Sequence, residues 1–160
     1  MKNKGSVKVE YLSDNMIQVD TIATWIFNEF IDGIKHDLSY GDILSNIKDC
    51  HKQELPVRFA ALIGDKCVGT VSLVKNDLSC RNYTPWLSAL YVDENFRSQG
   101  IGEQLIDTVI DKAQALGYDK IYLRTEFASG YYRKLGWEFV EACEDEGYNF
   151  ITNIFTFENM

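Results

Sequence analysis

The sequence has little of several features that mark particular classes of protein. Its 160 residues include only 2 prolines and 11 glycines, too few for a collagen-like or low-complexity chain. No apolar run approaches the 18 or so residues that a membrane-spanning helix needs. Its 16 basic side chains are outnumbered by 24 acidic ones, whereas binding to nucleic acid requires a basic face. We therefore expect neither a membrane protein nor a nucleic-acid-binding protein.

Cysteine and histidine are also sparse. No two of the cysteines are spaced like a metal knuckle or a redox pair, and they stand far apart: Cys50, Cys67, Cys80 and Cys143. We expect free, inert thiols, no metal site and no acyl-cysteine route. The first residues are basic and polar rather than apolar, which is not the pattern of a signal peptide. These features predict a cytoplasmic protein in a reducing compartment.

Apolar and acidic residues are what the sequence does contain. Apolar residues make up 46% and aromatic residues 13%, enough for one core, and the length predicts a single domain over residues 1–160. The formal net charge is −8. This surplus of carboxylates suits a cationic small molecule or basic peptide as a partner, and it also serves solubility alone. Composition does not decide between a cationic partner and a role in solubility alone.

Hydrophobic periodicity predicts a mixed α/β domain, in the order β-α-α-β-β-β-α-β-α-β-β. The predicted helices are 14–30, 39–51, 100–116 and 127–135. The predicted strands are 7–12, 57–63, 67–74, 86–92, 120–125, 137–142 and 148–157. Residues 86–92 are nearly all apolar, as in a strand buried on both faces.

The most informative segment is 90–102, where a strand is followed by a short loop and then by glycines that begin an amphipathic helix. Amide groups at the start of a helix have no intrahelical partner, and the helix dipole adds positive potential there. Glycine lets the backbone come close to a ligand. The segment therefore predicts a site for phosphate or pyrophosphate.

Three types of phosphate-binding loop compete for this segment. A Walker loop requires Gly-Lys-Ser/Thr, but Gly102 is followed by Glu103. A dinucleotide-binding fingerprint requires a third glycine where Leu105 stands. The pattern Arg-x-x-Gly-x-Gly is complete, with Arg97, Gly100 and Gly102. A helix that merely begins with glycine is the alternative for this motif taken alone.

The Arg-x-x-Gly-x-Gly segment resembles the pyrophosphate loop of the GCN5-related N-acetyltransferase (GNAT) family, whose members bind acetyl-coenzyme A. Residues 129–137, Ser-Gly-Tyr-Tyr-Arg-Lys-Leu-Gly-Trp, resemble the family's Phe-Tyr-x-Lys-Leu-Gly-Phe segment. The resemblance covers about 7–157, is strongest over 86–137, and is to small bacterial-type members. It implies the GNAT fold, an α/β (α+β) domain. In that fold about four helices flank a mixed, mostly antiparallel sheet of about seven strands, splayed between strands 4 and 5.

The resemblance also implies an activity and a set of site residues. The acetyl group of acetyl-coenzyme A would pass directly to a primary amine of an unidentified small molecule or peptide. Tyr132 occupies the position of the family's general acid, and the Val92 amide that of the oxyanion donor. The implied coenzyme-binding residues are Leu90, Tyr91, Val92, Arg97, Ser98, Gln99, Gly100, Ile101, Gly102, Thr125 and Tyr132. The resemblance implies no metal.

Alternatives stay open for several of these residues. Arg97 could instead pair with Asp93 or Glu94, and Tyr132 could be a half-buried aromatic residue with a hydrogen-bonded hydroxyl. Thr125 replaces an Asn that holds the pantetheine arm in many members, but it can still make one hydrogen bond. At the level of function, the alternative is a catalytically silent domain that binds acetyl-coenzyme A and regulates a partner. Dimers are common in the family, so a homodimer is also open.

The general base is not identified by the sequence. Many members use a carboxylate near the fourth strand, but residues 86–89 include no acid and no histidine. Glu126 is the nearest candidate, with a solvated loop carboxylate as the alternative. His36 and His51 lie on the predicted early helices, which border the acceptor site in the family, and surface or capping roles are their alternative.

Overall fold

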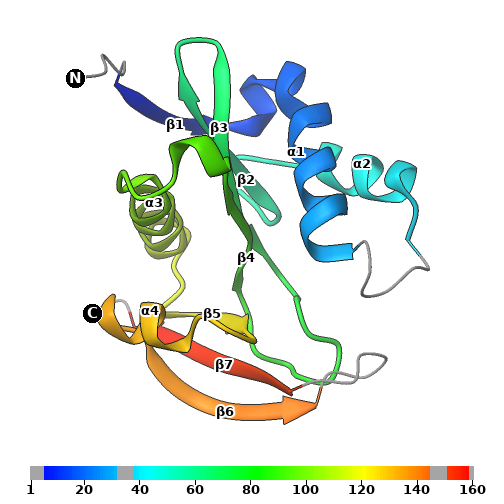
Figure 1. Cartoon of the computed structure of the whole chain (residues 1–160). Helices are drawn as coiled ribbons and strands as arrows, with labels where there is room; N and C mark the ends of the chain where they lie inside the picture. Colours follow the sequence, from blue (N-terminus) through cyan, green and yellow to red (C-terminus); the bar gives the residue numbers. More distant parts are fainter. Residues whose placement is uncertain (1–5, 32–37, 145–150, 159–160) are drawn as a thin grey trace.

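A single mixed sheet of seven strands forms the centre of the computed structural model, which describes residues 6–31, 38–144 and 151–158. Its strand order is β1-β2-β3-β4-β5-β7-β6 (Figure 1). Every neighbouring pair is antiparallel except β4 and β5, which are parallel. The strands are β1 Val7–Tyr11, β2 Val57–Ile63, β3 Lys66–Val74, β4 Trp86–Val92, β5 Lys120–Thr125, β6 Glu138–Glu144 and β7 Ile151–Glu158. The mixed, mostly antiparallel sheet expected from the resemblance is confirmed.

The helices follow the predicted order with shifted ends. They are α1 Val19–Ile26, α2 Tyr40–Lys48, α3 Ile101–Ala115 and α4 Ser129–Lys134. Helix α1 begins later than predicted because 3-10 turns occupy Leu12–Asp14 (η1) and Met16–Gln18 (η2), and it continues as a π-helical turn at Phe27–Ile31 (η3). A third 3-10 turn, Glu94–Phe96 (η4), follows β4. None of the described helices is both long enough and apolar enough to cross a bilayer.

Helix α2 begins with a capping box, which explains its sharp start. The Ser39 hydroxyl accepts a 3.1 Å hydrogen bond from the Asp42 amide, and the Asp42 carboxylate accepts a 2.9 Å bond from the Ser39 amide. Two of the amides that a helix start leaves without partners are thereby satisfied.

His36 and the first residues of the predicted strand 148–157 lie outside the described residues.

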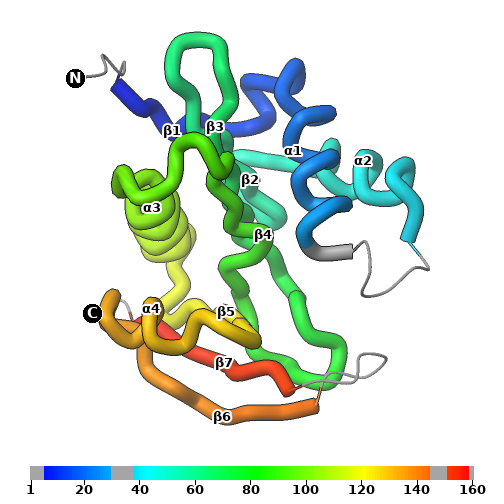
Figure 2. The backbone as a smooth tube through the Cα atoms, in the orientation of Figure 1, coloured from blue at the N-terminus to red at the C-terminus, as the bar shows by residue number. Residues whose placement is uncertain are grey.

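Helices cover both faces of the sheet, with α3 on one side and α1 and α2 on the other (Figures 1 and 2). Strand β2 shows how the two layers are built. Val57, Phe59 and Ala61 belong to the core under α3, whereas Ala60 and Leu62 belong to the core under α1 and α2. Side chains alternate between the faces of a strand, so a run of apolar residues supplies both layers.

Strand β4 is bent by a β-bulge near its middle. Ser88 pairs with Ser72 and Tyr91 pairs with Thr70, so two residues of β4 lie opposite one residue of β3. Within the bulge Ala89 adopts a left-handed φ of 56°. Bulges bend the strand that carries the extra residue. Beyond this point β4 runs away from β5.

The parallel strands β4 and β5 are joined at one end only. Their only register pair among the described residues is Trp86 with Tyr122. The prediction that 86–92 is buried on both faces is therefore wrong for its second half. Trp86 and Leu87 are buried, but the residues from Ser88 onward are only half-buried, because they face the gap between the diverging strands.

Candidate active site

A cleft of about 710 Å³ opens where β4 and β5 diverge. Its walls come from the second half of β4, the loop that leads into α3, the first turn of α3, the end of β5 and helix α4. Among the residues implied to bind the coenzyme or to act in the transfer, all except Gln99 line this cleft. The structure therefore brings together two segments, 90–102 and 125–132, that are separated along the chain.

The first turn of α3 presents unpaired amide groups. Gly100 is the N-cap residue, has a left-handed φ of 84°, and offers no side chain to cap the helix. The first intrahelical bond is the one that the Gln104 amide donates to the Gly100 carbonyl, at 3.1 Å. The amides of Ile101, Gly102 and Glu103 precede it and have no intrahelical partner. Three free amides at the positive end of a 15-residue helix form a site for an anion.

The glycines of this loop serve different purposes. A Cβ added at Gly100 would meet nothing within 4 Å, so glycine is needed there for its backbone angle alone. A Cβ at Gly102 would lie 3.4 Å from the Tyr131 hydroxyl, which leaves little room for a larger side chain. Ser98 also has a left-handed φ, of 63°, which costs a residue with a Cβ roughly 1 kcal/mol. Strain of this kind gathers at ligand-binding sites.

Arg97 folds back onto the end of β4. Its Nε donates a 2.8 Å hydrogen bond to the Val92 carbonyl, and its guanidinium carbon lies 5.2 Å from the centroid of the Tyr91 ring. Among the described residues it makes no ion pair with Asp93 or Glu94, the alternative considered from the sequence. The guanidinium therefore stays at the loop that precedes α3.

The peptide groups of Val92 point into the gap between the strands. The Asp93 amide donates to the Val68 carbonyl at 2.9 Å, so Asp93 is a hydrogen-bonded position in the antiparallel ladder with β3. Hydrogen-bonded positions alternate along such a ladder, so the N–H and C=O of the preceding residue face away from β3. The bond from Arg97 to the Val92 carbonyl confirms this direction. The Val92 amide faces the open side of β4.

Tyr132 places a protonated hydroxyl in the cleft. Its side chain is only 9% exposed, and its ring packs edge-to-face against Tyr131 and Trp137. Burial raises the pKa of its hydroxyl to about 12. That hydroxyl makes no hydrogen bond to any other described residue, and Tyr132 lines the cleft. Such a group can donate a proton or a hydrogen bond to a ligand.

Thr125 and Glu126 at the end of β5 are both held by neighbours. The Thr125 hydroxyl accepts a 3.0 Å hydrogen bond from the Ala128 amide just before α4, which leaves its own proton for one more bond. The Glu126 carboxylate accepts a 2.6 Å hydrogen bond from the hydroxyl of Thr152, a buried residue of β7. Glu126 is thus a half-buried, oriented carboxylate rather than the freely solvated one considered from the sequence.

Several cleft residues were not identified from the sequence. Glu29 reaches the cleft from η3, Tyr131 lies over Gly102, and Phe127 is 96% exposed at the edge of the cleft. Tyr131 stands next to Tyr132, which could have drawn attention to it. Glu29 gave no comparable signal, because its place depends on how α1 packs against the sheet.

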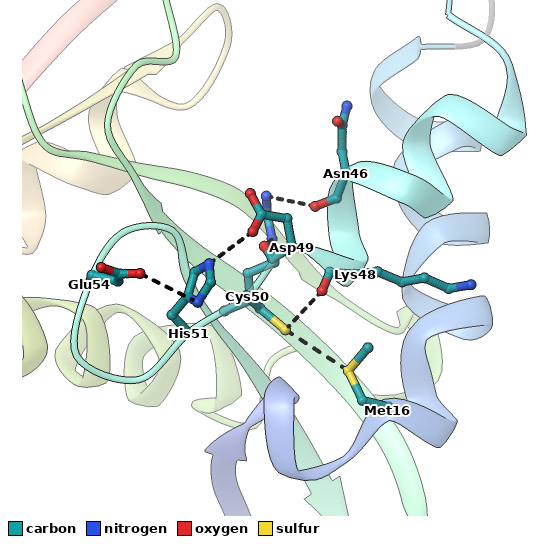
Figure 3. A network of polar contacts seen from close by, with 8 residues as sticks. Met16, Asn46, Lys48, Asp49, Cys50, His51 and Glu54 are labelled. Carbon is teal, nitrogen blue, oxygen red and sulfur yellow. Dashed lines mark hydrogen bonds and ion pairs between the residues drawn. The ribbon is translucent and has the colours of Figure 1, made fainter.

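His51 and Cys50 belong to a separate network near the end of α2, and neither lines the cleft (Figure 3). The His51 imidazole lies 2.9 Å from Asp49 and 3.8 Å from Glu54. The Cys50 thiol turns the other way, toward the Met16 sulfur at 3.9 Å. The two neighbours in sequence therefore do not form a nucleophile–base pair, and His51 is no candidate base at the cleft.

Burial raises the pKa of several cysteine thiols. Burial raises the pKa of Cys50, and raises that of Cys67 to about 11, so both thiols stay protonated at neutral pH. Within residues 6–31, 38–144 and 151–158, no three His, Cys, Asp or Glu side chains are grouped to hold a metal ion.

Comparison with known proteins points to one family. The model of the acetyltransferase (GNAT) family matches residues 20–137, well over half of the chain. No curated protein matches the sequence.

Similar solved structures include a GNAT-family acetyltransferase from Streptococcus pneumoniae, with a TM-score of 0.70, 12% identity, and coverage of 96% of this chain and 100% of that one. Another is Arabidopsis thaliana NAA60 in complex with acetyl-CoA, with a TM-score of 0.71, 14% identity, and 96% and 98% coverage. A third is an aminoglycoside 6'-N-acetyltransferase complexed with coenzyme A, with a TM-score of 0.73, 16% identity, and 94% and 96% coverage. At these identities the likeness is one of fold.

Proposed function

The chain belongs to the GNAT acetyltransferase family, and from this premise we propose that it transfers the acetyl group of acetyl-coenzyme A directly to a primary amine. One observation carries the proposal. A single cleft joins the uncapped start of α3, which suits the pyrophosphate of the coenzyme, to the hydroxyl of Tyr132, which has no partner among the described residues. Anion binding would hold the coenzyme, and proton donation would complete the release of its thiol.

The donor side of the cleft fits the coenzyme. The free amides of Ile101, Gly102 and Glu103 would hold the pyrophosphate, with the Arg97 guanidinium beside them. The open edge of β4 would receive the pantetheine arm as an extended strand, through backbone groups of Leu90 and Val92. The Thr125 hydroxyl has one proton left to donate to the arm.

Three groups of the chain would then act in the transfer. The Val92 amide would donate to the thioester oxygen as negative charge develops on it. The amine nitrogen forms a bond to the carbonyl carbon while the carbon–sulfur bond breaks, and Tyr132 would protonate the departing sulfur. Glu126 would accept the proton that the amine loses, because Thr152 holds its carboxylate at the cleft wall. Glu126 would release its proton to solvent, and solvent would return one to Tyr132.

Release of free thiol from acetyl-coenzyme A, followed across a panel of amines, tests the proposal. We expect thiol release that depends on both protein and amine, together with a product 42 Da heavier than the amine by mass spectrometry, since acetyl replaces one hydrogen. If the coenzyme binds in calorimetry but no amine is acetylated, the protein is a coenzyme-binding regulator instead. If the coenzyme does not bind, the proposed site itself is wrong.

A further inference from the structure

Two cysteines that are far apart in the sequence lie together in the structure. Cys80 belongs to the loop 75–85, which joins β3 to β4, and Cys143 lies near the end of β6. Their thiols are close enough to form a hydrogen bond with each other. Both side chains are half-buried and pack against the same small core cluster, which consists of Leu78, Trp86 and Ile154. The spacing of the cysteines along the chain gives no sign of this pair.

Neighbouring contacts hold the loop 75–85 against β6. The Arg81 guanidinium donates two 3.0 Å hydrogen bonds to the Glu141 carboxylate, and the Tyr83 hydroxyl donates a third bond to it. A two-point contact between guanidinium and carboxylate fixes orientation as well as distance. Arg81 directly follows Cys80, whereas Glu141 and Cys143 are two residues apart on β6 and so share a face. The loop and the end of β6 lie beside each other in Figure 1.

The two thiols are resting in the protonated form but accessible to a small reagent. Burial raises the pKa of the Cys143 thiol, the nearby Arg81 guanidinium lowers it in part, and the Cys80 thiol adds to the rise. The reactive thiolate therefore forms more readily as the pH rises above neutrality. Both cysteines keep some exposure, whereas Cys67 is buried. Access and a neighbouring thiol are what thiol–disulfide exchange requires.

We propose that Cys80 and Cys143 form an intramolecular disulfide when the protein meets a small-molecule disulfide such as oxidised glutathione. One thiolate attacks the small disulfide, which forms a mixed disulfide and releases one small thiol. The second thiolate attacks the protein sulfur of that mixed disulfide, which forms the bond between the cysteines and releases the second small thiol. The two protons pass to the released thiols. The cysteine pair is thus oxidised by two electrons, and the small disulfide is reduced by two.

The cross-link would enclose the part of the chain that forms the cleft. Residues 80–143 include β4, α3, β5 and α4, and with them every residue that lines the cleft except Glu29. Neither cysteine lines the cleft itself, so the bond would not obstruct it. A disulfide that closes a long loop restricts the unfolded chain more than one that closes a short loop. The oxidised protein should therefore be harder to unfold.

The test incubates the full chain with oxidised or with reduced glutathione at about pH 8, where exchange is faster. Of the four free thiols, we expect only Cys50 and Cys67 to be alkylated in denaturant after oxidation, and the intact protein to be lighter by two hydrogen atoms. A peptide map should join the peptides that contain Cys80 and Cys143. Tm, followed by circular dichroism, should rise by about 5–10 °C and return to its first value with dithiothreitol.

Cys80→Ser and Cys143→Ser each remove the pair, and each should abolish the rise in Tm. Cys50→Ser is the matched control, because Cys50 is also half-buried but lies after α2, against Met16. It should form the cross-link and show the same rise. The Tm of each reduced variant shows that it folds.

Glutathione retained on either cysteine, a bond between another pair, or four thiols still free after oxidation would overturn the inference. A cross-link without a rise in Tm would overturn its stabilising role. The measurements use no acetyl donor or amine, so they are independent of the proposed acetyl transfer.

Discussion

Nε of Arg97 and the carbonyl oxygen of Val92 are joined by a 2.8 Å hydrogen bond. This bond ties the loop before α3 to the end of β4, so that the proposed anion site and the proposed oxyanion donor are positioned by one contact. Because the same guanidinium lies over the Tyr91 ring, its place is determined by two half-buried residues, Val92 and Tyr91, rather than by an ion pair with another described residue.

The bond to Val92 predicts that a lysine cannot replace Arg97. Arg97→Ala should raise the Kd for acetyl-coenzyme A about tenfold, since a hydrogen bond from a charged donor contributes on the order of 1.5 kcal/mol. Arg97→Lys keeps the charge but lacks the planar fork that can serve Val92 and a phosphate together, so it should recover little of the loss. Calorimetric titration of the three proteins measures this. Full recovery by lysine would mean that charge alone matters.

Tyr132→Phe should lower kcat by roughly 10–100-fold, at the low end of general-acid effects, with little change in the Kd for acetyl-coenzyme A. The ring and its packing are retained, so the fold should survive. Tyr122→Phe is the control, since Tyr122 stacks on Tyr83 outside the cleft. Steady-state kinetics with one amine decide the outcome, and an unchanged kcat would remove Tyr132 from the mechanism.

The pKa of Tyr132 also predicts the shape of the pH–rate profile. Burial raises this pKa to about 12, so the hydroxyl keeps its proton throughout the ordinary range and the acid form is lost only as the pH nears that value. We expect kcat to show no alkaline fall attributable to Tyr132 up to about pH 10. The profile is measured with saturating substrates, in parallel with Tyr132→Phe. An alkaline limb below pH 10 that is present only with the tyrosine would contradict this.

Substitution at Gly102 tests the anion site by size and charge. Gly102→Glu should abolish binding of acetyl-coenzyme A, because it fills the start of α3 and adds a negative charge beside the free amides. Gly102→Ala should fold and keep measurable binding, since its Cβ would make only ordinary contacts, 3.4 Å from the Tyr131 hydroxyl and 3.9 Å from Val92. Retained affinity in the glutamate variant would place the pyrophosphate elsewhere.

Glu141 on β6 should make stability depend on acid pH. Its carboxylate accepts hydrogen bonds from Arg81 and from the Tyr83 hydroxyl, and these lower its pKa to about 2. A carboxyl group with a lowered pKa stabilises the fold above its unfolded pKa of about 4.5, and that contribution is lost as the pH falls toward 2. Glu141→Gln should therefore lower Tm at pH 7, and the difference from the unaltered protein should shrink toward pH 3.

Glu138→Gln serves as the control for this measurement, because Glu138 is an exposed carboxylate on the same strand. Its Tm should follow that of the unaltered protein at both pH values. Thermal unfolding followed by circular dichroism distinguishes the two variants. A Tm difference for Glu141→Gln that stays constant from pH 7 to pH 3 would show that the lowered pKa contributes nothing.

Local patterns in the sequence were enough for the order of elements and for much of the site. Gly117 and Gly136, which follow α3 and α4, have left-handed φ values of 92° and 95°, as glycines at helix ends commonly do. The motif with Gly100 and Gly102 predicted the free amides at the start of α3. These features depend on neighbours within a few residues, so a linear pattern records them.

The shape of the cleft depends on contacts between distant parts of the chain, and the sequence does not record them. The bulge at Ala89 contains no glycine, so the sequence does not indicate it. Strands β4 and β5 nevertheless diverge, and the second half of β4, which the sequence predicts to be buried, faces the cleft. Thr152 orients Glu126 from a strand 26 residues away. Glu29 lines the cleft from the π-helical turn that continues α1, far along the chain from β4 and α4.

The sequence alone therefore determined the α/β order, the glycine-rich start of α3 and Tyr132 as a candidate on the following helix, α4. The tertiary structure alone decided which peptide groups of β4 remain unpaired, where Arg97 points and which carboxylates line the cleft. The physical reason is the range of the interactions. Helix caps and glycine angles are set within one turn of chain, whereas strand separation and side-chain orientation are set by packing between elements that the chain brings together only on folding.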